Sequence, residues 1–564
     1  MDGPLAALPN MPDKATDCLS VAQSSLLIDR ALFGRRAVTL GLGAAFALAA
    51  RPVRAAGSLT GFHDVRDHGA KGNGATIDSP AFNRAIAAAS AAGGGTVVVP
   101  PGRYLCFSIR LKSHITLLLM PGAIIEAADP KRHKGQYDLP EGVFEEQLVD
   151  YGLAHFHNSL IYADGETDVA IVGRGIIHGL GLDREGPPPR WHGIAGWRSP
   201  AEQGLSADAA RRAIPLEMSY EGRGNKAIGL RSCHNVLLRD VIILQGGHFA
   251  CYVLGCTNVT IDNLTVDTDR DGIDIDCCRD VRISNCIVNA PKDDAIVLKS
   301  SYALQEARFC EEVTIIGCKT SGYLLGSIVD GSYRPSPYRS TDDLGVLGRI
   351  KLGTDSATGF RNILISGCTC DNTRGLQLGA IDGGVLEDVT FHDIHLRAPV
   401  NHPIFVRLAA RNRAPRGNGP SRVRRVRFSD IQVSGASGPY ACGIVGNPGQ
   451  PIEDISFSGV HVRSAGGGTA ADAARAIPER PGSSLEPSYM GTLPAHGLYI
   501  RHARNISLRD VSFDVEKPDA RPAILFDDVA GGVVDGLRST RSPRDAVRAI
   551  ASRDIATGNI HVLS

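Results

Sequence analysis

Aspartates are crowded into one short stretch of the sequence and recur shortly after it. The segment DTDRDGIDID holds Asp267, Asp269, Asp271, Asp274 and Asp276, and the pair Asp293-Asp294 follows Asp271 by about 22 residues. Carboxylates held close together have separated pKa values, so that one donates a proton while another accepts one at the same pH. Asp271, Asp293 and Asp294 are therefore candidate acid and base groups. Capping of turns and binding of calcium are the other roles open to such aspartates.

A repeated strand pattern brings these two segments together. A β-branched anchor residue recurs at intervals of about 22 to 51 residues, the range of solenoid repeats, at Val236, Val259, Val281, Val313, Ile363, Val389, Val426, Ile455 and Ile506. Alternation with period two indicates strands, and no helix-length periodic segment separates them. Strands of successive turns stack about 4.8 Å apart, so residues one repeat apart are neighbours. The sequence predicts an all-β, single-stranded, right-handed parallel β-helix in which Asp271 lies beside Asp293 and Asp294.

Several segments depart from this repeat. Asp78-Ser79-Pro80, an apolar stripe and the glycines at 93–95 predict a helix over residues 80–92 that caps the N-terminal end of the solenoid. Two stretches, 129–226 and 463–496, break the rhythm and are predicted to be loop insertions. Trp191 and Trp197 lie in the first, where they could stack on sugar rings or pack against the solenoid. The two longest intervals between anchor residues, 313–363 and 455–506, contain either two turns of the solenoid or one turn with a large loop.

The N-terminal residues have the pattern of an export signal. Arg35-Arg36 precede an apolar stretch at 37–50 and a small-residue cleavage site at 53–56. The apolar stretch is shorter than the roughly 20 residues that span a bilayer. Residues 1–56 are therefore predicted to be a twin-arginine signal that sends the β-helix domain, residues 57–564, to the periplasm or the cell exterior, with no membrane association.

Charge and cysteine content narrow the possible partners. Lysine plus arginine equals aspartate plus glutamate at 60 each, so no global charge attracts nucleic acid or an anionic membrane. Any acidic ligand must be held by local cations. The 13 cysteines lack the spacing and histidine partners of zinc sites, and most occupy apolar positions of the repeat. We expect no metal and no cofactor, and disulfides remain unassigned.

Three ordered motifs resemble those of a known family. DGIDID, KDDAIVLKS and GRIKLGT, together with the opening segment DVRDHGAKGNG, are similar to the signature blocks of glycoside hydrolase family 28, the polygalacturonases and their rhamnogalacturonan-cleaving relatives. The likeness covers nearly everything after the signal. It implies a pectin-lyase-like solenoid and inverting hydrolysis of acidic plant polysaccharide (pectin, homogalacturonan or rhamnogalacturonan oligomers). We expect the protein to be a monomer.

The resemblance also implies roles for individual residues. Asp293 matches the general acid, and Asp271 and Asp294 match the carboxylates that activate water. Arg349 and Lys351 match the pair that binds the carboxylate of the sugar, which supplies local positive charge.

Two positions depart from the family pattern. Asp269-Arg270 stands where the family has Asn-Thr, and Tyr323 stands where it has the histidine of Gly-His-Gly. A tyrosine does not titrate near neutrality, but its hydroxyl can donate a hydrogen bond to substrate. Tyr323 is therefore counted among the predicted substrate-binding residues, and His248 or the neighbouring Asp330 and Arg334 are candidates to compensate.

Several alternatives remain open from the sequence. A rhamnogalacturonan-specific hydrolase would use the same site. A calcium-dependent pectate lyase would need metal ligands and leave an unsaturated sugar, and a non-catalytic carbohydrate-binding β-helix would need no acid pair. The long segments near 131–223, 333–348, 411–416 and 463–496 predict a groove that is closed at one end, hence release of single sugars from a chain end.

Overall fold

The computed structural model describes residues 61–139, 152–153, 155–184, 222–338, 345–414, 419–482, 485–540 and 545–563. They belong to a compact unit that comprises residues 58–564. The predicted export signal, Trp191 and Trp197 lie outside the described residues. Within the described part of the chain, no helix is long and apolar enough to cross a bilayer.

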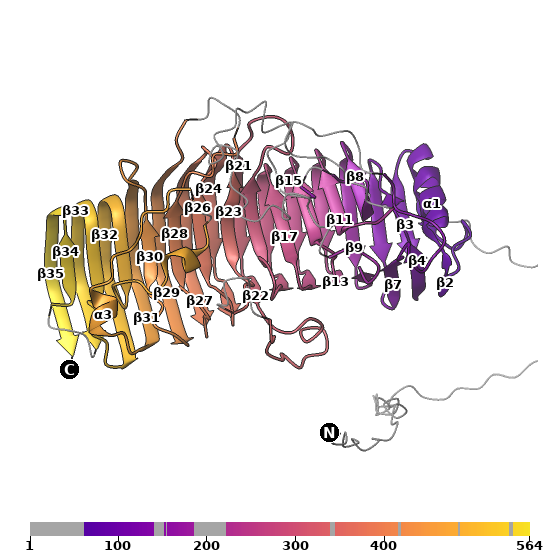
Figure 1. Cartoon of the computed structure of the whole chain (residues 1–564). Helices are drawn as coiled ribbons and strands as arrows, with labels where there is room; N and C mark the ends of the chain where they lie inside the picture. Colours follow the sequence, from indigo (N-terminus) through magenta and orange to yellow (C-terminus); the bar gives the residue numbers. More distant parts are fainter. Residues whose placement is uncertain are drawn as a thin grey trace, which may run out of the picture. The chain divides into compact units, whose positions relative to one another are not determined.

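The described chain winds into stacked turns of three strands, each paired in parallel with the corresponding strand of the next turn (Figure 1). One column of strands, the first sheet, carries the aspartate segment. It consists of β5 (Ile109–Arg110), β8 (Ser159–Asp164), β11 (Lys226–Arg231), β14 (Phe249–Leu254), β17 (Asp271–Asp276), β20 (Ile296–Ser300), β23 (Ile350–Ser356), β26 (Leu376–Ala380), β28 (Ile404–Leu408), β30 (Cys442–Val445), β32 (Leu498–Lys517), β33 (Ile524–Thr540) and β34 (Val547–Ile550).

The second sheet contains the anchor residues of the repeat. It consists of β1 (Phe62–Asp64), β3 (Gly95–Val99), β6 (Ile115–Leu119), β9 (Thr167–Gly173), β12 (His234–Arg239), β15 (Thr257–Asp262), β18 (Arg279–Ser284), β21 (Cys310–Ile316), β24 (Gly359–Ser366), β27 (Val385–Arg397), β29 (Arg422–Ala436), β31 (Ile452–Gly466), later parts of β32 and β33, and β35 (Arg553–Leu563). All nine anchors are 3% exposed or less. The repeat therefore marks the apolar interior, as predicted.

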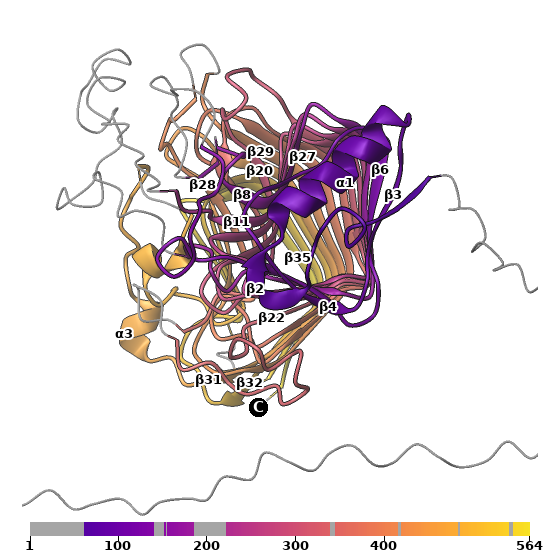
Figure 2. The same ribbon diagram turned by 90° about the vertical axis from the view of Figure 1, so that its right-hand side faces the viewer.

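The third sheet is made of shorter strands. It consists of β2 (Asn73–Ile77), β4 (Gly102–Cys106), β7 (Ala123–Ala127), β10 (Ile176–His178), β13 (Ile242–Leu244), β16 (Thr265–Asp267), β19 (Ile287–Asn289), β22 (Lys319–Ser321) and β25 (Thr369–Asp371). From β27 onward this strand is continuous with that of the second sheet. Figure 2 looks along the stack and shows the sheets enclosing the interior.

Each of these turns has a corner at a residue whose backbone adopts the left-handed conformation. The residue before each anchor has a φ between 54° and 57°, and these residues are Asn235, Asn258, Asp280, Glu312, Asn362, Asp388, Arg425, Asp454 and Asn505. Asn and Asp tolerate this conformation better than other non-glycine residues, which explains why they occupy most of these positions. Neighbouring corners also bond to each other, since Asn258 Nδ2 donates to Asn235 Oδ1 at 3.1 Å.

The predicted capping helix is present as α1 (Ser79–Ala91), which covers the N-terminal end of the stack (Figures 1 and 2). It buries Phe82, Ala85, Ile86 and Ala89 against the first turns. Asp78 precedes the helix, but its side chain does not bond to the helical amides. It accepts hydrogen bonds from Lys71 N and Gly72 N instead, and so fixes the preceding loop.

The structure settles the irregular intervals of the repeat. Each of the two longest is one turn with a large loop, because Val313 pairs directly with Ile363 and Ile455 with Ile506. The prediction of a continuous insertion from 129 to 226 is wrong, since β8, β9 and β10 form an ordinary turn within it. The unit TDVAIVG was overlooked because it stands far from the next anchor in the sequence. The insertion at 463–496 begins within β31 and includes α3 (Ala470–Ala473) and the 3₁₀-helix η1 (Pro487–Met490).

The described cysteines are structural. All twelve are buried and unpaired, as expected for small apolar side chains in the stack. Each therefore contributes to packing, and none forms a disulfide with another described cysteine.

Candidate active site

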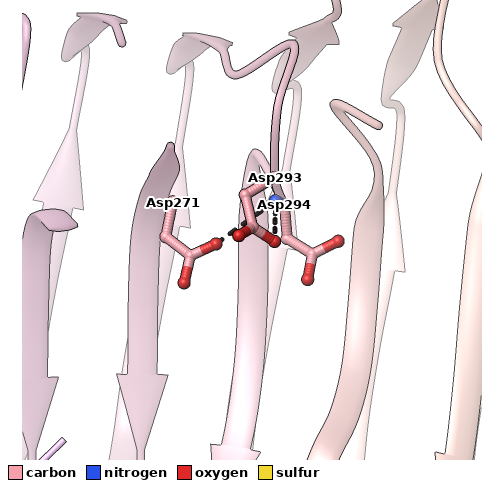
Figure 3. Close-up of side chains that lie close together, drawn as sticks. All are labelled: Asp271, Asp293 and Asp294. Atoms are coloured by element: carbon pink, nitrogen blue, oxygen red, sulfur yellow. Dashed lines mark hydrogen bonds between the residues drawn. The ribbon is translucent and has the colours of Figure 1, made fainter. Parts of the chain in front are cut away.

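The three predicted acid and base residues lie together on the first sheet. Ile273 of β17 pairs with Ile296 of β20, a register that places Asp271 opposite Asp294. The carboxylates of Asp271, Asp293 and Asp294 each offer an oxygen within 4.8 Å of the others. The Asp294 amide donates to Asp271 Oδ1 at 3.3 Å and to Asp293 Oδ1 at 3.1 Å (Figure 3). The juxtaposition inferred from the repeat is thus confirmed.

Asp294 is held in its ionised form. Arg349 Nε donates to one carboxylate oxygen, and Lys351 Nζ donates to the other at 2.9 Å. Burial opposes ionisation of Asp294, but the charges of Arg349 and Lys351 outweigh it and lower the pKa of this carboxyl below its ordinary value. Asp294 is therefore ionised at neutral pH.

Asp293 has the opposite character. Burial and the neighbouring charge of Asp271 raise its pKa to about 7, although Arg270 partly offsets them. Arg270 lies 3.2 Å from Asp293, and both side chains are 23% exposed. Asp293 can hold a proton near neutral pH while remaining accessible from outside, which suits a general acid.

Lys299 supports the third aspartate. Its Nζ donates to Asp271 Oδ2 at 3.2 Å and to Asp274, and its side chain is 9% exposed. Burial disfavours the charged amine, but Asp271 and Asp274 outweigh this effect and raise the pKa of Lys299. A buried cation needs such partners. Sequence reasoning did not single out Lys299, although it lies within the KDDAIVLKS motif.

The other aspartates of the cluster have structural roles. Asp276 accepts hydrogen bonds from Tyr252 and Ser301, and Asp267 accepts from the backbone of residues 328 and 329. Asp269 pairs with Arg184 and Lys292, each at 3.2 Å. The structural alternative of bonding to nearby backbone amides thus holds for Asp267 and Asp276, whereas Asp269 forms ion pairs.

A glutamate from a distant part of the chain also reaches the site. Glu486 accepts hydrogen bonds from Arg349 Nη1 at 3.0 Å and from Nη2 at 2.6 Å, and Arg374 Nη1 donates to it at 3.0 Å. Sequence reasoning missed Glu486 and Arg374. No local signal could have found Glu486, because it follows Arg349 by 137 residues in an irregular loop.

Tyr323 lies in the turn after β22. Its amide donates to Asn289 Oδ1 at 2.7 Å, and its ring packs edge-on against Tyr333 at 5.7 Å between centroids. Among the described residues, no contact joins Tyr323 to the aspartates. The neighbouring Asp330 and Arg334 pair with each other at 3.1 Å. The structure does not bring these residues into the cluster.

His248 is linked to Asp293 through Arg270. Its Nδ1 faces the Arg184 carbonyl at 3.1 Å, and its Nε2 faces Arg270 at 3.3 Å. Burial and the charge of Arg270 lower the pKa of His248 well below its ordinary value. A neutral imidazole can accept a hydrogen bond from Arg270, so His248 helps to hold the cation that contacts Asp293.

The carboxylates at the centre of the site already have cationic partners. Asp294 uses both oxygens for Arg349 and Lys351, and Asp271 bonds to Lys299. A divalent cation bound by Asp271, Asp293 and Asp294 would have to compete with these charges. These three carboxylates are therefore poorly suited to bind calcium, as a calcium-dependent pectate lyase would require.

The outer face of the first sheet is covered beyond the site. Residues 477–482 and 485–495, which we call the strap, run over β28, β30, β32 and β33 and form a separate apolar cluster with them, composed of Phe405, Ala441, Val445, Ile477, Met490, Leu493, Ala495, Tyr499 and Leu525. Leu485 packs on Ile381 and Ala409. The loop that contains α3 lies outside the coil in Figure 2.

The sheet is also covered on the N-terminal side of the aspartates. Leu153 and Phe156 pack on Phe249 and Tyr252 of β14, and the Tyr252 hydroxyl oxygen lies 3.0 Å from the Leu153 carbonyl oxygen. Between the region covered by the strap and the region covered by Leu153 and Phe156, the outer face of the first sheet is therefore partly exposed around Asp293.

Comparisons with known proteins agree with the β-helix fold. Residues 62–127 match a family model described as rhamnogalacturonase A/epimerase, pectate lyase-like, and residues 201–327 match one described as a right-handed β-helix region. The chain is 23% identical over 329 residues to a probable polygalacturonase of Vitis vinifera, a match that covers 54% of this chain and 59% of that protein. It is 22% identical over 384 residues to a probable polygalacturonase of Arabidopsis thaliana, covering 66% and 71%.

A solved structure shows the same fold. A hyperthermoactive exopolygalacturonase from Thermotoga maritima superposes with a TM-score of 0.57 at 21% identity, covering 80% of this chain and 91% of that one. The right-handed parallel β-helix predicted from the repeat is confirmed. Together these matches confirm the resemblance of the chain to the polygalacturonases of glycoside hydrolase family 28.

Proposed function

We propose that the protein is a glycosidase that hydrolyses pectic polysaccharide, with Asp293 as general acid and Asp271 and Asp294 as the carboxylates that activate water. The observation that carries this proposal is the opposite ionisation of adjacent carboxyls. The pKa of Asp293 is raised to about 7, while that of Asp294 is lowered. The polygalacturonases among the relatives support the same activity.

In the proposed reaction, Asp293 gives its proton to the glycosidic oxygen as the bond to the anomeric carbon breaks. Water attacks the anomeric carbon and loses a proton to Asp294 or Asp271, and Asp293 is reprotonated from solvent. Inverting enzymes usually separate the two carboxyls by about 6.5 to 9.5 Å, and retaining enzymes by about 5 to 5.5 Å. The nearest oxygens here lie within 4.8 Å, so distance alone does not favour inversion.

The hydrogen bonds of the site do not distinguish the inverting from the retaining route. Both oxygens of Asp294 accept from Arg349 and Lys351, and those of Asp271 accept from Lys299 and the Asp294 amide. Hydrogen bonds from cations weaken a carboxylate both as a base and as a nucleophile toward carbon. The proposal of inversion therefore rests on the family resemblance.

We further propose exo action on a chain end. The strap covers the outer face of the first sheet from β26 to β33 and is fixed there: Gln377 Nε2 donates to the Leu485 carbonyl, Arg407 to the Arg480 carbonyl at 2.7 Å, and Arg501 to the Ile477 carbonyl. A polymer cannot lie across a sheet whose outward side chains are buried. Export by the signal at 1–56 would place such an enzyme where pectic polymers occur.

Incubation with homogalacturonan, rhamnogalacturonan and their oligomers tests the proposed function. We expect new reducing ends and single sugars as the first products. Asp293→Asn serves as the control, because its amide cannot donate a proton as a carboxylic acid does. A wild-type protein that binds these polymers without cleaving them would favour the non-catalytic alternative.

A rhamnogalacturonan-specific hydrolase is the second candidate. The match of residues 62–127 to the rhamnogalacturonase model and the replacement of the family histidine by Tyr323 favour it. Preferential cleavage of rhamnogalacturonan oligomers in the same incubation would identify this activity. Tyr323, Arg349 and Lys351 remain the predicted substrate-binding residues for either substrate.

A further inference from the structure

All three nitrogens of the Arg349 guanidinium bond to carboxylates of the protein itself. Nε donates to Asp294, while Nη1 and Nη2 form a two-pronged contact with Glu486. Arg349 is 1% exposed, whereas the Glu486 side chain is 25% exposed. Glu486 thus covers the guanidinium on the accessible side, in the position where an Arg residue would otherwise take a ligand carboxylate.

Glu486 is fixed in this position from two directions. Arg374, which also donates to the Val346 carbonyl at 3.2 Å, holds its carboxylate from the sheet. The preceding residue, Leu485, is fully buried and anchored by Gln377. Glu486 is therefore a built part of the site and not the tip of a free loop.

Glu486 also completes the charge balance beside the acid. Contacts link Lys299, Arg349, Lys351 and Arg374 to Asp271, Asp274, Asp294 and Glu486. The four formal positive charges are matched by four formal negative ones, and Asp293 pairs separately with Arg270. Without Glu486, this network would carry one excess positive charge and two empty guanidinium donors at Arg349.

We propose that Glu486 is a specificity-determining residue that takes the carboxylate place at Arg349, so that the adjoining subsite holds an uncharged sugar. The inference deepens the proposed function and rests on it. A galacturonate carboxylate at this subsite would lack the two Arg349 donors that Glu486 occupies and would meet the negative charge of Glu486. A rhamnose ring or a methyl-esterified galacturonate avoids both penalties. This inference revises the role that the family resemblance implies for Arg349.

Binding of matched oligosaccharides tests the inference separately from catalysis. Oligogalacturonides of one length, either as free acids or fully methyl-esterified, are titrated calorimetrically into Asp293→Asn protein with and without Glu486→Ala. We expect Glu486→Ala to shift the affinity ratio about tenfold or more toward the free acid, because it opens a charged hydrogen-bonding site. Glu486→Gln, which keeps the shape of the strap, should shift the ratio in the same direction by less.

Glu479→Gln is the matched control. It removes one carboxylate from the same strap, but one that pairs with Arg501 and His502. The ratio should stay unchanged in this variant. An unchanged ratio in both Glu486 variants, an equal loss for both ligands, or no binding of either ligand overturns the inference. Failure of the proposed function has a different signature, since wild-type protein would then release no reducing ends from any pectic polymer.

Discussion

Arg270→Gln should move the alkaline limit of activity to higher pH. Asp293 must be protonated to act as the acid, so activity falls as the pH rises through its pKa of about 7. The positive charge of Arg270 favours the ionised form of Asp293 and so lowers this pKa. Removing that charge disfavours ionisation, and the pKa rises.

The size of the shift follows from the ion pair. At 3.2 Å two unit charges interact by about 5 kcal/mol at an effective dielectric of about 20 and by about 1 kcal/mol in bulk water. Both side chains are 23% exposed, so solvent screens part of the interaction. A value of about 1 to 3 kcal/mol corresponds to about one to two pKa units. The limit should therefore move to between about pH 8 and 9.

The pH dependence of kcat/KM for the wild type and Arg270→Gln measures this shift in the free enzyme. Arg184→Gln is the control, because Arg184 pairs with Asp269 at 3.2 Å and not with Asp293. It should shift the limit much less. An unchanged limit in Arg270→Gln, or a shift to lower pH, would refute the assignment of Asp293 as the acid whose pKa Arg270 tunes.

Three further predictions concern catalysis, stability and mode of action. Asp293→Asn should lower kcat by a factor on the order of 100 or more in a folded protein, and near-normal turnover would remove Asp293 from the acid role. Lys299→Met should reduce the free energy of unfolding by about 3 to 5 kcal/mol in a urea titration, because it leaves Asp271 and Asp274 buried without their cation; a change below about 1 kcal/mol would contradict the importance of this contact. Viscosity of a pectic polymer should fall slowly relative to the appearance of reducing ends, whereas a steep early fall with oligomers preceding monomer would show an open groove.

The repeat made the fold and the central carboxylates predictable. A β-branched residue preceded by Asn or Asp marks most of the corners, because the corner needs a left-handed residue followed by a buried one. Once this register is known, the interval between Asp271 and Asp293-Asp294 places them side by side. The turn at 159–178 escaped prediction, since a single strand unit without a neighbouring repeat has no rhythm to recognise.

The residues that tune the site were harder to predict. Glu486 reaches Arg349 from a loop whose path depends on apolar packing of the strap, and no periodic pattern encodes that packing. Lys299 lies in a recognised motif, but only its burial beside Asp271 and Asp274 reveals its task. The motif at Tyr323 predicts a substrate contact, and only the fold shows that the ring of Tyr323 packs against Tyr333.

Proton NMR of a pectic digest followed in real time, with a chelator present, tests the central claim most directly. Hydrolysis by Asp293, Asp271 and Asp294 predicts that the first product is a saturated sugar with an inverted anomeric configuration, released at an unchanged rate in the chelator. An unsaturated sugar, or loss of activity on chelation, would contradict the account and identify a metal-dependent lyase.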